Sequence, residues 1–157
     1  MPKMSEIIVF DANFFICMNS IRAKNLLGNL DSVASDLGFE YYISTVVFDE
    51  IKAPHTFREK FQKIIRVEEI TDSEIEAVKK SLSSQGIRFP AQDPDLSLLS
   101  LSQKLYGNDN ELKISLVSDD FKLVKNANLF FHGKINTLSL SSFLLKIHRT
   151  ISNKQLI

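Results

Sequence analysis

Short apolar runs rich in β-branched and aromatic residues alternate along this chain with longer stretches of helical pattern. The runs are "EIIVF" at 6–10, "YYISTVV" at 41–47, a third near the end of 57–70, "LKISLV" at 112–117 and "LFF" at 129–131. A short apolar run without polar alternation indicates a strand that is buried on both faces. Strands that alternate with helices pair in parallel through right-handed crossovers. The pattern therefore predicts an α/β fold of three layers, with helices on both faces of a central parallel sheet.

Glycine and proline mark where several of the helices end. Gly38 suits the C-terminal cap of a helical region that follows the first strand and runs to about Leu37. The residue before Pro54 is biased away from helix, so the short helix in "FDEIKAP" should stop near Ala53. A final helix is expected over about 139–148.

Two helix starts carry clear N-terminal signals. Thr71 and Glu74 have the spacing of a capping box, which predicts a helix that runs to about residue 83. Asp93 is expected to cap the next helix, with Pro94 in its first position and a leucine-rich stretch following. A further helix is expected after "SDD" at 118–120.

The composition is that of an ordinary globular domain and excludes several classes of site. The chain has 157 residues, 44% of them hydrophobic, so we expect a single domain over 1–157. With 19 basic and 19 acidic residues, no overall field indicates a nucleic-acid or membrane partner. Cys17 is the only cysteine, which excludes an internal disulfide and a thiolate zinc site and favours a cytoplasmic location. No signal peptide or membrane-spanning run is recognisable.

Acidic residues stand at marked positions of this predicted fold. Asp11 ends the first strand, Glu50 follows the second, Asp95 opens the leucine-rich helix, and Asp119 and Asp120 end the "ISLV" strand. Ligands of open α/β sheets bind beyond the carboxyl ends of the strands, near the point where strand order reverses. If the first and fourth strands are neighbours, Asp11 and Asp120 lie close together there, with the other acids approaching from flanking helices.

Several carboxylates in one cleft repel one another, and this points to a cation. Without one, at least one pKa would rise until its group became neutral. Oxygen ligands of this kind suit Mg²⁺ or Mn²⁺, which orient water and stabilise the leaving oxygen of a phosphodiester. Asn13 would support such a site by a hydrogen bond to a ligand carboxylate or a metal-bound water, and Ser118 by orienting the adjoining loop or a phosphate. Each acid alone also fits a turn, a cap or a solvated helix position, so only the joint pattern predicts the site.

At these residues the chain resembles the PIN domain, a family of metal-dependent nucleases. The motifs are "IIVFDAN", "YYISTVVFDEIK", "DLSLLSLSQKL" and "SLVSDDF", in which Ser118 stands where the family has threonine. The resemblance implies a parallel sheet of about five strands in the order 3-2-1-4-5, with "NLFF" in the place of the last core strand. It implies Mg²⁺- or Mn²⁺-dependent cleavage of single-stranded RNA, an endoribonuclease activity. On this match the catalytic and metal-binding residues are Asp11, Glu50, Asp95 and Asp120, with Asp119 as an accessory ligand.

Two subgroups of the family remain open. Ribosome-assembly PIN nucleases carry a cysteine-rich zinc ribbon, which a single cysteine excludes here. VapC-like toxins are compact single domains, neutralised by a small antitoxin-like partner and often homodimeric. Single-domain archaeal or bacterial PIN proteins of unassigned role have the same appearance. The toxin-type interpretation is preferred, with an RNA-processing endonuclease as the alternative.

A basic stretch offers a second contact for nucleic acid. Arg58, Lys60, Lys63 and Arg66 alternate with Phe57 and Phe61 and could follow a phosphate backbone. The same pattern also fits an amphipathic helix with its bases in water, and this is the preferred reading.

Two other functions compete with the nuclease. A haloacid-dehalogenase-like phosphatase also begins with a strand that ends in Asp, but it needs a second Asp where this chain has Asn13, a poor proton donor. A catalytically silent PIN-fold protein that binds RNA or acts in assembly is the other alternative, against which the intact acids speak.

Overall fold

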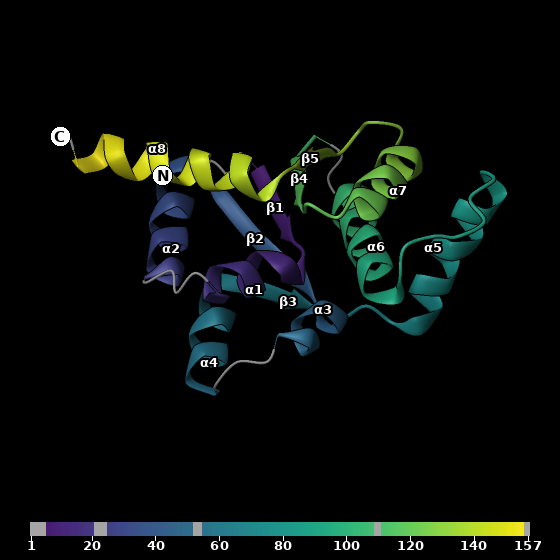
Figure 1. Ribbon diagram of the computed structural model, residues 1–157, viewed down its shortest axis with the longest axis horizontal. Coiled ribbons are helices and arrows are strands. Elements are labelled where there is room, and N and C mark those ends of the chain that lie inside the picture. The colour runs from purple at the N-terminus through teal and green to yellow at the C-terminus, as the bar shows by residue number, and fades with distance from the viewer. Residues whose placement is uncertain (1–5, 21–24, 52–54, 109–110, 156–157) are drawn as a thin grey trace.

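A computed structural model describes residues 6–20, 25–51, 55–108 and 111–155 of the chain. Strands and helices alternate over most of its length (Figure 1). The elements are β1 (Glu6–Phe10), α1 (Ala12–Ser20), α2 (Leu26–Leu37), β2 (Phe39–Ser44), α3 (Thr45–Glu50), α4 (His55–Ile64), β3 (Ile65–Glu68), α5 (Asp72–Ser84), α6 (Asp93–Asn108), β4 (Lys113–Val117), α7 (Phe121–Phe131), β5 (Asn136–Leu138) and α8 (Leu140–Gln155).

The five strands form one parallel sheet in the order β3-β2-β1-β4-β5. β1 lies in the centre, where Ile8 is level with Tyr41 of β2 and with Ser115 of β4. All five residues of β1 are buried, which explains its unbroken apolar run. The predicted three-layer α/β fold with this strand order is confirmed.

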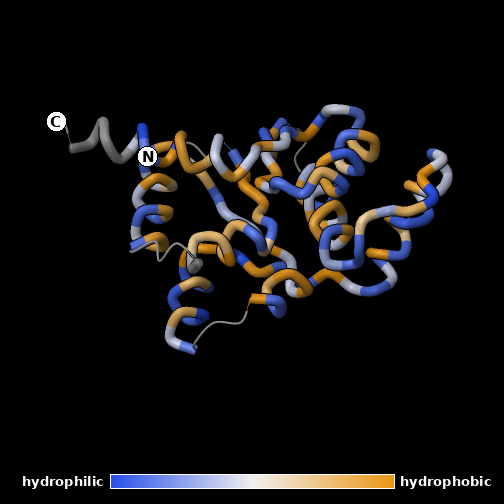
Figure 2. Tube along the Cα trace, viewed as in Figure 1, coloured by the Kyte–Doolittle hydropathy of each residue, from blue (hydrophilic) through white to orange (hydrophobic). Residues whose placement is uncertain are grey.

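The helices form two groups. α5, α6 and α7 contact one another, and α2 contacts α4 and α8. Figure 1 shows these groups on opposite sides of the strands. In Figure 2 the central strand β1 is largely hydrophobic, whereas the helices alternate between hydrophobic and hydrophilic positions. This alternation is expected of helices that turn one face to the sheet and the other to solvent.

Aromatic rings fill the core beneath β1. The ring of Phe10 lies 4.8 Å from that of Phe14, 5.2 Å from that of Phe15 and 5.3 Å from that of Phe143, between ring centres. Phe15 in turn contacts Phe61 of α4 at 4.7 Å. Because these rings belong to β1, α1, α4 and α8, they hold the start of α1 rigidly against the sheet.

The expected strand at 41–47 ends earlier than predicted. β2 stops at Ser44, whose hydroxyl accepts a hydrogen bond from the Val47 N–H at 3.1 Å and so caps α3. The residues "TVV" then enter the helix despite their β-branched side chains. The cap and the burial of Val47 outweigh a propensity difference that is small for each residue.

The expected strand "LFF" at 129–131 is wrong. These residues form the C-terminal end of α7, in which Leu123, Ala127 and Phe131 share one buried face. The chain then turns through His132 and Gly133, both of which have positive φ, and the last strand is β5. Periodicity over the whole segment, rather than the apolar triplet, decided its structure.

Helix ends differ from the prediction by smaller amounts. α3 ends at Glu50, and Ala53 lies outside the described residues. Asp93 is the first residue of α6 rather than its cap, since the Leu96 N–H donates to the Gln92 carbonyl. Two helices rather than one helical region lie between β1 and β2, and α8 extends to Gln155.

Two predicted caps are confirmed. Thr71 and Glu74 form the full capping box at the start of α5. Gly38 ends α2 in the left-handed conformation, with φ of 72°. None of the described helices is long and apolar enough to cross a membrane.

Candidate functional site

Asp11 lies at the carboxyl end of the central strand. Its backbone N–H donates to the Val117 carbonyl at 3.2 Å, which continues the pairing of β1 with β4. Its side chain is buried, with 4% of the residue exposed, and Oδ2 accepts a hydrogen bond from the Ser118 hydroxyl at 2.8 Å. The first and fourth strands are therefore neighbours, as expected. The hydrogen bond from Ser118 fixes the direction of the Asp11 carboxylate.

Ser118 connects Asp11 to the next acid. The Asp120 N–H donates to Ser118 Oγ at 3.0 Å, while the Ser118 hydroxyl donates to Asp11. Ser118 is itself buried, and its N–H donates to the Leu138 carbonyl of β5. The residue thus orients the loop after β4, as the sequence suggested for it.

The neighbouring acids Asp119 and Asp120 point to different helices. Asp120 caps α7, because its Oδ1 accepts from the Leu123 N–H at 3.1 Å. Asp119 is exposed, and its Oδ1 accepts from the Leu140 N–H at the start of α8, at 2.9 Å. Asp119 therefore holds α8, whereas Asp120 stays near Asp11.

Glu50 and Asp95 reach the same edge from helices. Glu50 is the last residue of α3, which follows β2 directly, and it is exposed. Asp95 lies half-buried in the first turn of α6. Asn13 is exposed in the first turn of α1, and its N–H approaches Asp11 Oδ1 at 3.5 Å.

Two serines that the sequence analysis did not single out connect α3 to α6. The hydroxyls of Ser44 and Ser97 lie 2.7 Å apart, both fully buried, and Ser97 also donates to the Pro94 carbonyl beside Asp95. This contact sets the helix carrying Glu50 against the helix carrying Asp95. The local signal was weak: Ser44 stands just before one helical segment, where serine is common, and Ser97 is the fifth residue of the other.

Burial and the charges of neighbouring acids raise the pKa of three of these carboxyl groups, those of Asp11, Glu50 and Asp95. Burial raises the pKa of Asp11 above its ordinary value, against hydrogen bonds from Ser118 and from nearby backbone, and the charge of Asp120 raises it further. Burial, followed by the charges of Asp11, Asp120 and Glu50, raises the pKa of Asp95 to about 7. Burial and the charge of Asp11 also raise the pKa of Glu50. Because the charges of the other three acids affect the pKa of Asp95, those three carboxylates lie within electrostatic range of it.

Among the described residues, no basic side chain pairs with these four carboxylates. In the described part of the chain, ion pairs form elsewhere, and none includes Asp11, Glu50, Asp95 or Asp120. Among the same residues, no three His, Cys, Asp or Glu side chains lie close enough together to hold a metal ion directly. The donor set has the chemistry of a hard divalent cation, but its members are spaced more widely than a closed coordination shell.

The basic stretch of α4 and β3 divides between two regions. Arg58 lies 4.3 Å over the Phe48 ring and donates to the Ile51 carbonyl, so it braces the end of α3. Lys60 and Lys63 are exposed, and Arg66 donates to the Tyr42 hydroxyl at 2.9 Å. Phe61 is fully buried, as the amphipathic reading of this helix expects.

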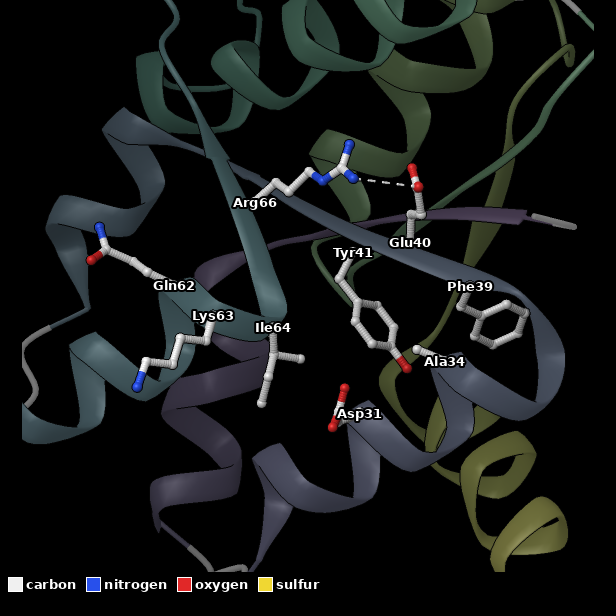
Figure 3. A pocket seen from close by; sticks show the side chains of 9 residues that line it. All are labelled: Asp31, Ala34, Phe39, Glu40, Tyr41, Gln62, Lys63, Ile64 and Arg66. Atoms are coloured by element: carbon white, nitrogen blue, oxygen red, sulfur yellow. Dashed lines mark ion pairs between the residues drawn. The ribbon is translucent and has the colours of Figure 1, made fainter. Parts of the chain in front are cut away.

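Lys63 and Arg66 line a cavity of about 210 Å³ near the start of β2 and β3 (Figure 3). Figure 3 shows Arg66 directed at Glu40, with which it forms an ion pair at 3.6 Å. In a parallel sheet the amino and carboxyl ends of the strands lie at opposite edges. This cavity, lined by the first residues of β2, is therefore away from Asp11, and its two cations do not adjoin the acids.

Comparison with known proteins supports the fold. No protein-family model matches the chain, and no curated protein matches it either. Among solved structures, a chain in the crystal structure of VapBC2 from Rickettsia felis, bound to a DNA fragment from their promoter, has a TM-score of 0.53 to this chain. The match has 15% sequence identity and covers 85% of this chain and 98% of the other. The PIN-like fold implied by the sequence motifs is confirmed.

Proposed function

We propose that this chain is a metal-dependent nuclease that hydrolyses phosphodiester bonds of single-stranded RNA, an endoribonuclease with residues 1–157 as one PIN-like domain. The observation that carries the proposal is the group of four mutually repelling carboxylates at the carboxyl ends of the strands, without a compensating base among the described residues. A protein gains nothing in stability from such a group, so a ligand is its natural explanation.

Mg²⁺ or Mn²⁺ is the proposed cofactor, with Asp11, Glu50, Asp95 and Asp120 as its ligands, directly or through water. Mg²⁺ usually keeps several waters and takes only one or two carboxylates, which suits acids spaced too widely for a closed shell. When bound, such an ion supplies a more acidic water and stabilises charge on a leaving oxygen. Asp119 has a supporting role in this scheme, because its carboxylate is committed to α8.

The chain's own residues orient the site in this scheme. Ser118 holds one oxygen of Asp11, and the Leu123 N–H holds one oxygen of Asp120, so each carboxylate retains a second oxygen for a ligand. Glu50, exposed at the end of α3, is the most adaptable of the four. The exposed amide of Asn13 stands beside Asp11, where it would hydrogen-bond a water or a phosphate oxygen.

A toxin-type role is proposed within this function. The structural neighbour VapBC2 is a complex bound to a DNA fragment from its promoter. By that likeness we expect a small antitoxin-like protein as a partner and a homodimer as the oligomeric state. Co-expression with candidate small proteins encoded nearby, followed by a growth assay, would test the toxin role separately from the chemistry.

The experiment is cleavage of a labelled single-stranded RNA in Mn²⁺, with Asp11→Asn and Asp93→Asn compared with the parent. Asp11→Asn should abolish cleavage while circular dichroism shows the fold retained, because it removes one charge from the proposed metal site. Asp93 is in the same turn as Asp95 but pairs with Lys79 at 2.7 Å, so its variant should cleave normally. Undiminished cleavage by Asp11→Asn would refute the assignment.

One observation favours a second function. The wide spacing of the acids is also what a catalytically silent RNA-binding or assembly protein with this fold would show. Binding of RNA without any cut at saturating Mn²⁺ would support that function. Turnover of p-nitrophenyl phosphate alone would instead favour a dehalogenase-like phosphatase.

A further inference from the structure

An exposed phenylalanine borders the acidic group. Phe121 is the first residue of α7 and follows Asp120 directly, and 80% of it is exposed. Among the described residues, few large apolar side chains are exposed at all, and Phe121 is the most exposed of them. Single exposed apolar residues are normal on proteins, so its exposure acquires meaning only from its surroundings.

Two lysines share the solvent side of the same helix. Lys122 and Lys125 are exposed, and neither forms an ion pair with a described residue. Leu123 and Asn126, on the opposite side, are buried. Lys122 also stands in the first turn, where the helix dipole disfavours a positive charge, and no acid stands in that turn. The exposed phenylalanine and the lysine in this first turn bring no local stability, and both lie beside the proposed active site.

This combination suits single-stranded nucleic acid. Four carboxylates without an ion-pair partner among the described residues repel a phosphate backbone. Binding of such a substrate therefore requires basic side chains and an uncharged contact nearby. Proteins that bind single strands provide an aromatic ring on which a base stacks and basic side chains that meet the phosphates. Three of the four cations of the earlier stretch do not fill this role, because Arg58 and Arg66 are engaged within the protein and Lys63 lies at the opposite end of the strands.

We propose that the first two turns of α7 form a nucleotide-binding surface: a base of single-stranded RNA stacks on Phe121, and the adjoining phosphates pair with Lys122 and Lys125. The choice of RNA as ligand depends on the nuclease function proposed above. The stacked nucleotide lies next to Asp120, so the surface sets the register of the strand relative to the four acids. Phe121 acts here as a positioning residue, since it touches a base rather than the reacting phosphate.

The test measures fluorescence anisotropy of a short labelled RNA with the full chain carrying Asp11→Asn, which keeps the probe uncut. Adding Phe121→Ala should weaken binding about tenfold, within the range that one base–aromatic stack contributes. Phe121→Tyr should bind as the parent does, because it keeps the aromatic face. Changing Lys122 and Lys125 together to Gln should reduce the slope of log affinity against log salt by about 1.4, the value for two phosphate contacts with a single strand.

Phe89→Ala is the matched control, because Phe89 is 79% exposed but lies in the loop before α6. That loop is attached to the middle of α7 by the hydrogen bond from the Ala91 N–H to Asn126 Oδ1. Phe89→Ala should keep full affinity, and the same RNA with abasic residues should bind the parent and Phe121→Ala equally.

The outcomes separate the two proposals. If Phe121→Ala binds RNA with unchanged affinity, the nucleotide-binding surface is refuted, whatever the cleavage assay shows. Contact with a protein would then be the remaining explanation for the exposure of Phe121. An equal loss in Phe89→Ala also overturns the nucleotide-binding surface. If binding depends on Phe121 but the chain with Asp11 intact never cuts RNA in Mn²⁺, the surface is supported and the nuclease is refuted.

Discussion

Replacing Asp95 by Asn should stabilise the metal-free protein. The carboxylate of Asp95 is partly buried and faces the charges of Asp11, Asp120 and Glu50, which with burial raise its pKa from 3.8 to about 7. Within the described part of the chain, no hydrogen bond or ion pair of its side chain would be lost in the variant. An amide of the same shape removes the repulsion and leaves the packing of α6 unchanged.

The magnitude follows from the pKa shift. A rise of about 3 units corresponds to about 4 kcal/mol of unfavourable interaction once the group is ionised. Because Asp95 is partly exposed, solvent screening reduces this to about 2 kcal/mol. Loss of a negative charge from the first turn of α6 costs about 0.5 kcal/mol. The net gain is about 1.5 kcal/mol, which raises the melting temperature of a chain this size by about 3–6 °C.

The gain depends on pH in a defined direction. Below pH 3.8 the carboxyl is protonated in both the folded and the unfolded chain, and it imposes no penalty. Between pH 3.8 and about 7 the unfolded chain ionises first, so the parent loses stability as the pH rises. Thermal melts in EDTA over this range should therefore show the two proteins diverging with increasing pH and running in parallel above about pH 7.

Asp93→Asn is the control for these melts. Asp93 lies in the same helical turn, but its carboxylate is exposed and pairs with Lys79. Its variant should be equal to the parent or slightly less stable, by at most about 1 kcal/mol. If Asp95→Asn lowers the melting temperature in EDTA, or follows the parent at every pH, the four acids do not repel one another and the basis of the proposed site is lost.

Three further outcomes are expected. Mn²⁺ at 100 times its dissociation constant should stabilise the parent by about 2.7 kcal/mol, seen as a higher melting temperature, and should stabilise Asp95→Asn less. An equal effect on both proteins would contradict the site. Ser44→Ala should lower the free energy of urea unfolding by about 1–2 kcal/mol and also slow RNA cleavage. Thr71→Ala removes the distant cap of α5, so it should lower that free energy by about 1 kcal/mol and leave cleavage unchanged. Lys113→Met should lower the free energy of unfolding by about 2 kcal/mol, because the buried Glu6 loses its nearer partner at 3.1 Å. Lys104→Met breaks a more exposed ion pair and should lower it by under about 1 kcal/mol. Similar losses in the two variants would show that burial of Glu6 has no effect.

Much of this fold is determined by local sequence. The mainly apolar runs at 6–10 and 112–117 form central strands, because a strand covered on both faces buries nearly all of its side chains. The capping box of Thr71 and Glu74 and the glycine after α2 act within a few residues, so they could be recognised without tertiary information. The motif resemblance added the strand order, which the alternation of strands and helices does not specify.

Other features depended on packing. "LFF" has the composition of a strand, but it became helical because Leu123, Ala127 and Phe131 bury one face of α7 together. The motif resemblance ranked Asp120 above Asp119 as a ligand, but only the positions of α7 and α8 decide which helix each carboxylate contacts.

The sequence by itself determined which side chains carry charge and that each follows a strand or opens a helix. Tertiary structure alone decided how near one another they lie. The hydrogen bond from Ser118 to Asp11 joins residues 107 positions apart, and it exists because β4 pairs with β1 in a register that brings Val117 level with Phe10. Local patterns act over one or two turns of chain, whereas the distance between two strand ends depends on strand order and register, to which residues along the whole chain contribute.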